Sequence, residues 1–188
     1  MTSADIPAEK VVGPSRADDD VLRVEHVTKS FGPTTALRDI NLHLRKGEVL
    51  GLLGDNGAGK STLIKIMCGF HRPDAGEMWC KGEPYAPKSV LDARARGIDT
   101  VYQDLALIGR LKAEGNVSIV MILHNYVHVF QACDRVSLIQ DGVISLDKPT
   151  NETSVDELNE IVVEEYRRAR QAAKAEEAAA AQVQNDAA

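Results

Sequence analysis

Eight consecutive residues have the types and spacing needed to bind phosphate. Residues 54–61 read G-D-N-G-A-G-K-S and fit the pattern G-x-x-x-x-G-K-S. Glycines permit backbone conformations that side chains block, so successive N–H groups can form a concave nest for anionic oxygens. Lys60 adds a mobile ammonium, and Ser61 offers a hydroxyl to Mg²⁺. The predicted binding residues are Gly54, Asp55, Asn56, Gly57, Ala58, Gly59, Lys60, Ser61 and Thr62.

The segments on either side of this loop favour the same interpretation. Residues 48–53 are short and mostly apolar, which is typical of a buried parallel strand. Residues 61–68 can continue as a helix, whose amino-terminal dipole would favour an anion. An order of strand, glycine-rich loop and helix predicts an α/β protein with a P-loop NTPase core.

Two further polar residues each follow an apolar stretch. Gln103 comes after the expected strand 98–102, and His124 comes after the apolar run 117–123, which is expected to be a second buried strand. Strand ends of open α/β sheets are where ligands bind. Gln103 could therefore ligate Mg²⁺ or orient water, and His124 could hydrogen-bond a γ-phosphate and its attacking water. An exposed strand-end amide and a core histidine remain alternatives.

Local patterns predict the remaining elements. Alternation predicts antiparallel strands before the phosphate loop, with His43 on the solvent-facing side. Asp141-Gly142 predicts a hairpin turn, and Ser154 with Glu157 predicts a helix-capping box. The expected strands are 21–27, 36–44, 77–81, 135–140 and 143–146, and the expected helices are 87–96, 127–132 and 154–171.

Composition indicates one cytoplasmic domain with tails. We expect a disordered leader at 1–19, a nucleotide-binding domain at 20–166 and a helical or disordered tail at 167–188. The net charge of −6 argues against a nucleic-acid partner, and no apolar run approaches membrane-spanning length. Three cysteines without a C-x-x-C spacing are expected to be small buried side chains in a reducing compartment.

Taken in order, these features resemble the ATP-binding subunit of ABC transporters, and within that family the carbohydrate importers of ribose, xylose or fructose type. The resemblance covers about residues 21–165. The matching segments are Phe31, the loop 54–61, the turn 72–76, the segment 96–105, the segment 122–125, and the hairpin residues 134–136 and 141–142.

The resemblance implies ATP and Mg²⁺ as cofactors. It implies that Phe31 stacks on adenine, with a core plug as the alternative, and that Gln103 and His124 are catalytic, Gln103 also as a metal ligand. The implied partners are a membrane permease, a periplasmic sugar-binding protein and a second ATP-binding subunit. The assembled protein would lie on the inner face of the plasma membrane.

The sequence also departs from the family pattern. His124 follows Gln103 by only 21 positions. The family places a helical subdomain, a Leu-Ser-Gly-Gly-Gln signature and an acidic strand ending in Asp-Glu between them, and none of these is present. In the family, the carboxylates of that strand hold Mg²⁺ and polarise the attacking water. Because this chain lacks them, we expect nucleotide binding with little or no hydrolysis. Loss of the signature argues against a closed dimer.

Two alternatives remain. The first is a non-hydrolysing nucleotide-binding remnant or interaction protein without a transport role. The second is a P-loop kinase, which needs an arginine-rich lid. Only Arg94 and Arg96 cluster, and a solvated helix face explains them.

Overall fold

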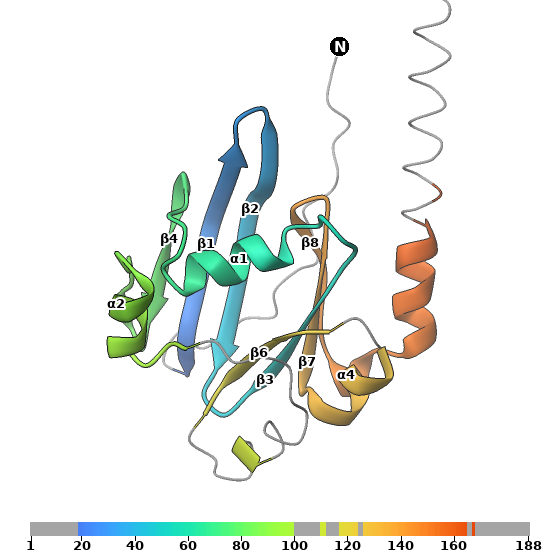
Figure 1. Cartoon of the computed structure of the whole chain (residues 1–188). Coiled ribbons are helices and arrows are strands. Elements are labelled where there is room, and N and C mark those ends of the chain that lie inside the picture. Colours follow the sequence, from blue (N-terminus) through green and yellow to red (C-terminus); the bar gives the residue numbers. More distant parts are fainter. Residues whose placement is uncertain (1–18, 100–109, 112–116, 124–125, 165–166, 168–188) are drawn as a thin grey trace, which may run out of the picture. The chain divides into compact units, whose positions relative to one another are not determined.

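The computed structural model describes residues 19–99, 110–111, 117–123, 126–164 and 167. The chain divides into two units, Met1–Thr150 and Asn151–Ala188, which are described separately. The described strands of the first unit form two four-stranded sheets, with the orders β2-β1-β4-β5 and β6-β3-β7-β8 (Figure 1). This arrangement confirms the predicted antiparallel strands and P-loop-type sheet.

The first sheet is antiparallel throughout its described pairs. Its strands are β1 (Asp20–Phe31), β2 (Thr34–Arg45), β4 (Ala75–Cys80) and β5 (Glu83–Pro84). Alternation along β1 is interrupted at His26, whose φ of 54° is left-handed, and the buried series resumes at Val27. Asp39 of β2 has the same φ, and its Oδ1 lies 2.7 Å from Nδ1 of His26. The two bulges therefore face each other and keep the apolar side chains of both strands on the core face.

The second sheet carries the phosphate loop. Its strands are β3 (Val49–Leu53), β6 (Ile119–Ile122), β7 (Arg135–Gln140) and β8 (Val143–Pro149). β3 is buried at every residue and pairs in parallel with β6 and β7, whereas β7 and β8 form the expected antiparallel hairpin. The prediction of a buried strand at 117–123 is confirmed as a strand at Ile119–Ile122, but of the residues in β6 only Met121 is buried.

Of the expected strand 98–102, only residues 98 and 99 are described, and neither is in a strand. Ile98 and Asp99 follow helix α2 without strand structure, and Asp99 accepts a hydrogen bond from Nε of Arg94 at 2.8 Å. The rest of this segment, with Gln103, lies outside the described residues.

The helices have local start signals. Helix α1 (Lys60–Met67) begins directly at the phosphate loop, with Gly59 as its N-cap. Helix α2 (Val90–Ala95) begins later than predicted because the Ser89 side chain accepts a hydrogen bond from the Asp92 N–H and so caps it. Helix α4 (Tyr126–Ala132) lies before β7.

The second unit contains a helix over residues 155–164, which follows the short 3-10 turn Thr150–Glu152. The N–H of Glu157 donates to the Ser154 hydroxyl at 3.1 Å, which is one of the two hydrogen bonds of the predicted capping box. The Glu157 carboxylate accepts from the Thr153 hydroxyl at 2.8 Å. The last described residue, Arg167, is also helical.

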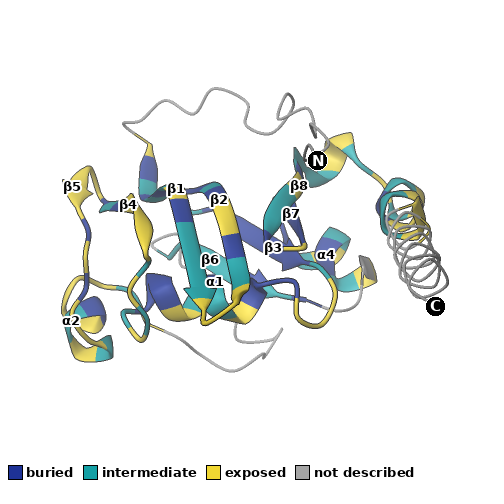
Figure 2. Cartoon of the chain, turned by 90° about the horizontal axis from the view of Figure 1, so that it is seen from above, coloured by how far each residue is buried: buried dark blue, intermediate teal, exposed yellow. Residues whose placement is uncertain are grey.

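The core of the first unit lies where the first sheet, β3 and α1 meet. Figure 2 shows β3 dark blue along its length. Fully buried side chains from three elements pack together here: Ile40 of β2, Leu52 of β3, and Leu63 and Ile66 of α1. Burying such side chains fixes the orientation of α1, and hence of the loop before it.

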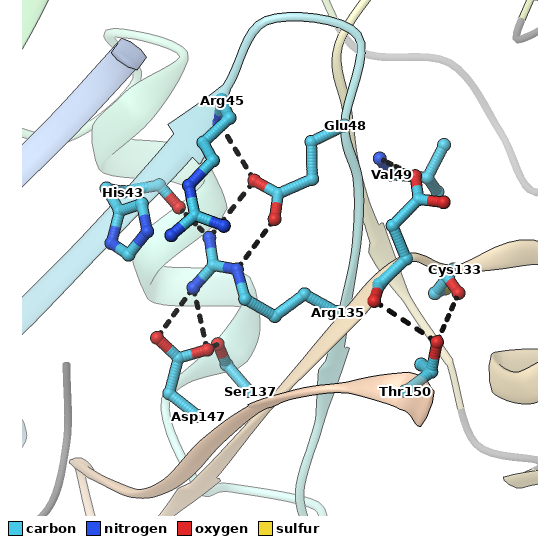
Figure 3. Close-up of polar contacts among 10 residues, drawn as sticks. His43, Arg45, Glu48, Val49, Cys133, Arg135, Ser137, Asp147 and Thr150 are labelled. Atoms are coloured by element: carbon cyan, nitrogen blue, oxygen red, sulfur yellow. Dashed lines mark hydrogen bonds and ion pairs between the residues drawn. The ribbon is translucent and has the colours of Figure 1, made fainter. Parts of the chain in front are cut away.

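A buried ionic cluster joins the two sheets at the start of β3 (Figure 3). Arg135 Nε lies 2.7 Å from Oε1 of Glu48, and its Nη1 lies 2.6 Å from Oδ2 of Asp147. Nη2 of Arg135 donates to the carbonyl oxygen of His43 in β2. Burial opposes ionisation of Glu48, but hydrogen bonds from Arg135 and from the backbone of Arg45 outweigh it and lower the pKa of Glu48.

The prediction that His43 faces solvent was wrong. His43 is only 5% exposed, and the guanidinium of Arg135 in β7 donates to its backbone carbonyl oxygen. Cys68, Cys80 and Cys133 are buried, as expected. In the portion of the chain that the structure describes, no helix is long and apolar enough to cross a membrane.

Candidate functional site

The loop from Gly54 to Gly59 follows β3 and packs tightly against backbone from two other strands. A Cβ placed on Gly54 would lie 2.0 Å from the carbonyl oxygen of Ile139 in β7. A Cβ on Gly59 would lie 2.6 Å from the carbonyl oxygen of Ala36 in β2. Both glycines also have positive φ values, 140° and 108°. Only glycine therefore fits either end of the loop.

Lys60 begins helix α1 and points back over the loop. Its Nζ donates hydrogen bonds to the carbonyl oxygens of Gly54 at 2.6 Å and Asp55 at 2.7 Å. Burial lowers the pKa of the Lys60 ammonium, and the charge of Asp55 partly offsets this effect. The loop thus holds a cation close to its own concave side.

A cavity of about 230 Å³ opens at this position. It is lined by Asn56, Gly57, Gly59, Lys60, Ser61, Thr62 and Ile122. The lining combines backbone amides, one ammonium and two hydroxyl groups, a set suited to an oxygen-rich anion with a bound hard cation. Ser61 is exposed, so its hydroxyl is open to such a cation. The residues present therefore fit a nucleotide phosphate with Mg²⁺.

Phe31 lies at the end of β1. It is 46% exposed, so the alternative that it fills the core is wrong. Its ring meets that of His71 edge-on, with 5.2 Å between centroids. The Nζ atom of Lys29 lies 5.6 Å from the Phe31 centroid. A half-exposed ring in this position offers a face on which a base could stack.

The two other predicted catalytic residues, Gln103 and His124, lie outside the described residues. The strand before His124 is β6, which pairs with β3 so that Ile122 stands opposite Leu52. Ile122 lines the cavity. Sequence reasoning did not identify Ile122 as a site residue, although its place near the end of the apolar run 117–123 was a signal for it.

Sequence reasoning also missed Gly142, which contacts the loop backbone. Its turn chemistry was recognised, but no local pattern connects it with a loop that lies so far before it in the chain. Among the described residues, no group of three or more His, Cys, Asp or Glu side chains is placed to hold a metal ion.

Residues 37–186 match the family described as ABC transporter, and the chain belongs to this family. Two curated relatives show the kind of member that it resembles. One is the xylose/arabinose import ATP-binding protein XylG of Sulfolobus acidocaldarius, 51% identical over 52% of this chain. Another is the ribose import ATP-binding protein RbsA of Jannaschia sp., 34% identical over 76% of this chain.

The chain spans 39% of the length of the first relative and 28% of the second. Among solved structures, cbiO1 of Clostridium perfringens, part of an ABC transporter complex, superimposes with a TM-score of 0.61. That match covers 71% of this chain and 90% of the other at 18% identity. A nucleotide-free ATP-binding cassette matches with a TM-score of 0.59 at 17% identity, over 77% of this chain and 95% of the other. These likenesses establish the fold.

Proposed function

We propose that this chain binds Mg-ATP at residues 54–61 as the nucleotide-binding part of a carbohydrate import system. The observation that carries the proposal is the cavity at the end of β3, where backbone amides, Lys60 and the Ser61 hydroxyl converge. Lys60 would contact the terminal phosphates and Ser61 would ligate Mg²⁺. Import of a sugar is supported by the names of the curated relatives.

We propose the partners that membership of the ABC transporter family implies, although the missing signature argues against closure of a dimer with the second ATP-binding subunit. They are a membrane permease, a periplasmic sugar-binding protein and a second ATP-binding subunit, with this chain in the cytoplasm against the membrane. Gln103 and His124 are proposed to contact Mg²⁺, the γ-phosphate and the attacking water, and Phe31 to stack on adenine.

We further propose that this chain hydrolyses ATP poorly. Between Gln103 and His124, the sequence has no apolar run followed by Asp-Glu. Such a carboxylate base contributes about 10²–10⁴-fold to the rate. Binding needs only the amide nest and the ammonium, whereas cleavage also needs a group to activate water.

The test is a titration of the full chain with Mg-ATP. Lys60→Ala is expected to weaken binding by at least about 100-fold, because a charge-assisted contact to phosphate is lost. Lys65→Ala is the matched control, since Lys65 lies in the same helix and is exposed. Equal affinities of wild type and Lys60→Ala would overturn the proposed site.

Phosphate release separates binding from hydrolysis. The wild-type chain with Mg-ATP is expected to release phosphate no faster than Lys60→Ala does. Rapid metal-dependent release that Lys60→Ala abolishes would contradict the proposal of poor hydrolysis and leave the binding site intact. Binding without turnover would favour the non-hydrolysing alternative with no transport role, which complementation of sugar uptake would then test.

A further inference from the structure

The turn between β7 and β8 contacts the phosphate loop and β2 at once. The N–H of Gly142 donates to the carbonyl oxygen of Ala58 at 3.2 Å. The carbonyl oxygen of Gly142 accepts from the N–H of Arg38 at 2.7 Å. Figure 1 shows this turn beside the chain that leads from β3 to α1. One residue therefore links the loop to the first sheet through its own backbone.

The space around this residue is closed. A Cβ on Gly142 would lie 2.8 Å from the carbonyl oxygen of Ala36, and φ at Gly142 is 79°. The same oxygen is the nearest atom to a Cβ placed on Gly59, at 2.6 Å. The turn and the phosphate loop thus both lie close to one carbonyl group of β2, so a side chain added to either glycine would reach that group.

We propose that the Asp141-Gly142 turn is a positioning element for the phosphate loop, so that nucleotide binding and the packing of this turn stabilise each other. The inference rests on the proposed nucleotide site. Gly142 does not line the cavity and acts through Ala58 and Ala36. Because coupling between two sites is reciprocal, loosening the turn weakens binding, and bound nucleotide tightens the turn.

The chain contains a matched control turn. Lys81-Gly82 joins β4 to β5, with φ values of 53° and 80°, close to the 46° and 79° of Asp141-Gly142. A Cβ on Gly82 would meet no atom within 4 Å. Alanine imposes the same backbone strain at either glycine, and only at Gly142 does it also disturb the loop.

The first experiment is a Mg-ATP titration of the full-length wild type, Gly142→Ala and Gly82→Ala, with the unfolding free energy of each. Gly142→Ala is expected to bind about tenfold more weakly, and Gly82→Ala within about twofold of wild type. The two variants are expected to lose similar amounts of unfolding free energy and to differ mainly in their affinity for Mg-ATP. Equal affinities of the two variants would overturn the inference.

The second experiment uses only the wild type and does not depend on a variant folding. Hydrogen exchange is measured with and without saturating Mg-ATP. The amides of Arg38 and Gly142 are expected to exchange about tenfold more slowly with nucleotide. The amide of Lys81, which donates to the carbonyl oxygen of Val21 at 3.0 Å, is the internal reference and is expected not to change.

The outcomes separate the two proposals. Nucleotide binding with unchanged exchange at Arg38 and Gly142 overturns the coupling and leaves the proposed site in place. If hydrogen exchange at the Lys81 amide slows equally, nucleotide stabilises the fold as a whole, and the coupling is also overturned. Failure of the wild type to bind Mg-ATP overturns the proposed function, and the coupling falls with it.

Discussion

Nε of Arg135 lies 2.7 Å from Oε1 of Glu48, and both side chains are buried. Glu48 immediately precedes β3, and Gly54 immediately follows it. The same strand therefore runs from a buried ion pair at one end to the phosphate loop at the other. Removal of a single partner from such a pair leaves an uncompensated buried charge, which costs far more than loss of an exposed pair.

Arg135→Met is expected to lower the unfolding free energy by about 3–5 kcal/mol, because Glu48 and Asp147 then remain buried without their cation. The measurement is urea unfolding at neutral pH. Arg94→Met is the control, since the Arg94–Asp99 pair is half exposed and is expected to contribute about 0–1 kcal/mol. Similar losses in the two variants would show that the buried cluster does not hold the sheets together.

The buried His43 side chain is expected to make the unfolding free energy depend on pH. Burial, followed by the nearby charge of Arg135, lowers the pKa of His43 below its ordinary value of 6.5. The unfolded chain then binds a proton before the folded chain does. The contribution of His43 to the unfolding free energy is therefore fully present above pH 6.5 and is lost as pH falls through and below that value.

The variant His43→Gln is expected to reduce this slope between pH 7 and pH 5, because the titrating group is gone. Denaturant unfolding at several pH values measures it. The Nε2 atom of His43 has no hydrogen-bond partner among the described residues, so glutamine at this position breaks no side-chain bond at that atom. An unchanged slope in the variant would assign the pH dependence to another group.

Local patterns predicted the elements whose signals are close in sequence. The apolar run of β3, the glycines of the loop and the Asp141-Gly142 turn are each specified within a few residues, and the structure has a strand, loop and hairpin there. The start of α2 was missed because the Ser89 cap prevailed over the proline at position 87.

Long-range packing was not predictable in this way. Alternation placed His43 on the face opposite the apolar side chains of β2, but the residue is buried, and its carbonyl oxygen accepts a hydrogen bond from Arg135, 92 positions away. The bulge at His26 was also missed, because its partner Asp39 lies on the neighbouring strand. The contact of Gly142 with Ala58 has the same origin: it depends on how two strands meet, which no short segment encodes.

Within the phosphate loop, Gly59→Ala and Gly57→Ala are expected to differ. Both positions have positive φ, 108° and 89°, so both variants carry backbone strain of about 1–3 kcal/mol. At Gly59 the added Cβ also meets the Ala36 carbonyl oxygen, whereas at Gly57 nothing lies within 4 Å. Thermal unfolding and Mg-ATP titration should show larger losses for Gly59→Ala. Equal losses would mean that strain alone governs the loop.

Phe31→Ala tests the base-binding face. Phe31 is 46% exposed, so its replacement should change stability little, while lost stacking should weaken ATP binding by about 1–3 kcal/mol. Phe70→Ala is the control, since Phe70 is 65% exposed and its ring meets the ring of His71 as that of Phe31 does. Competition titrations with inorganic triphosphate separate the base from the phosphates, because the variant should bind this ligand as wild type does. If Phe31→Ala weakens the binding of inorganic triphosphate as much as the binding of ATP, then Phe31 supports the loop and does not stack on the base.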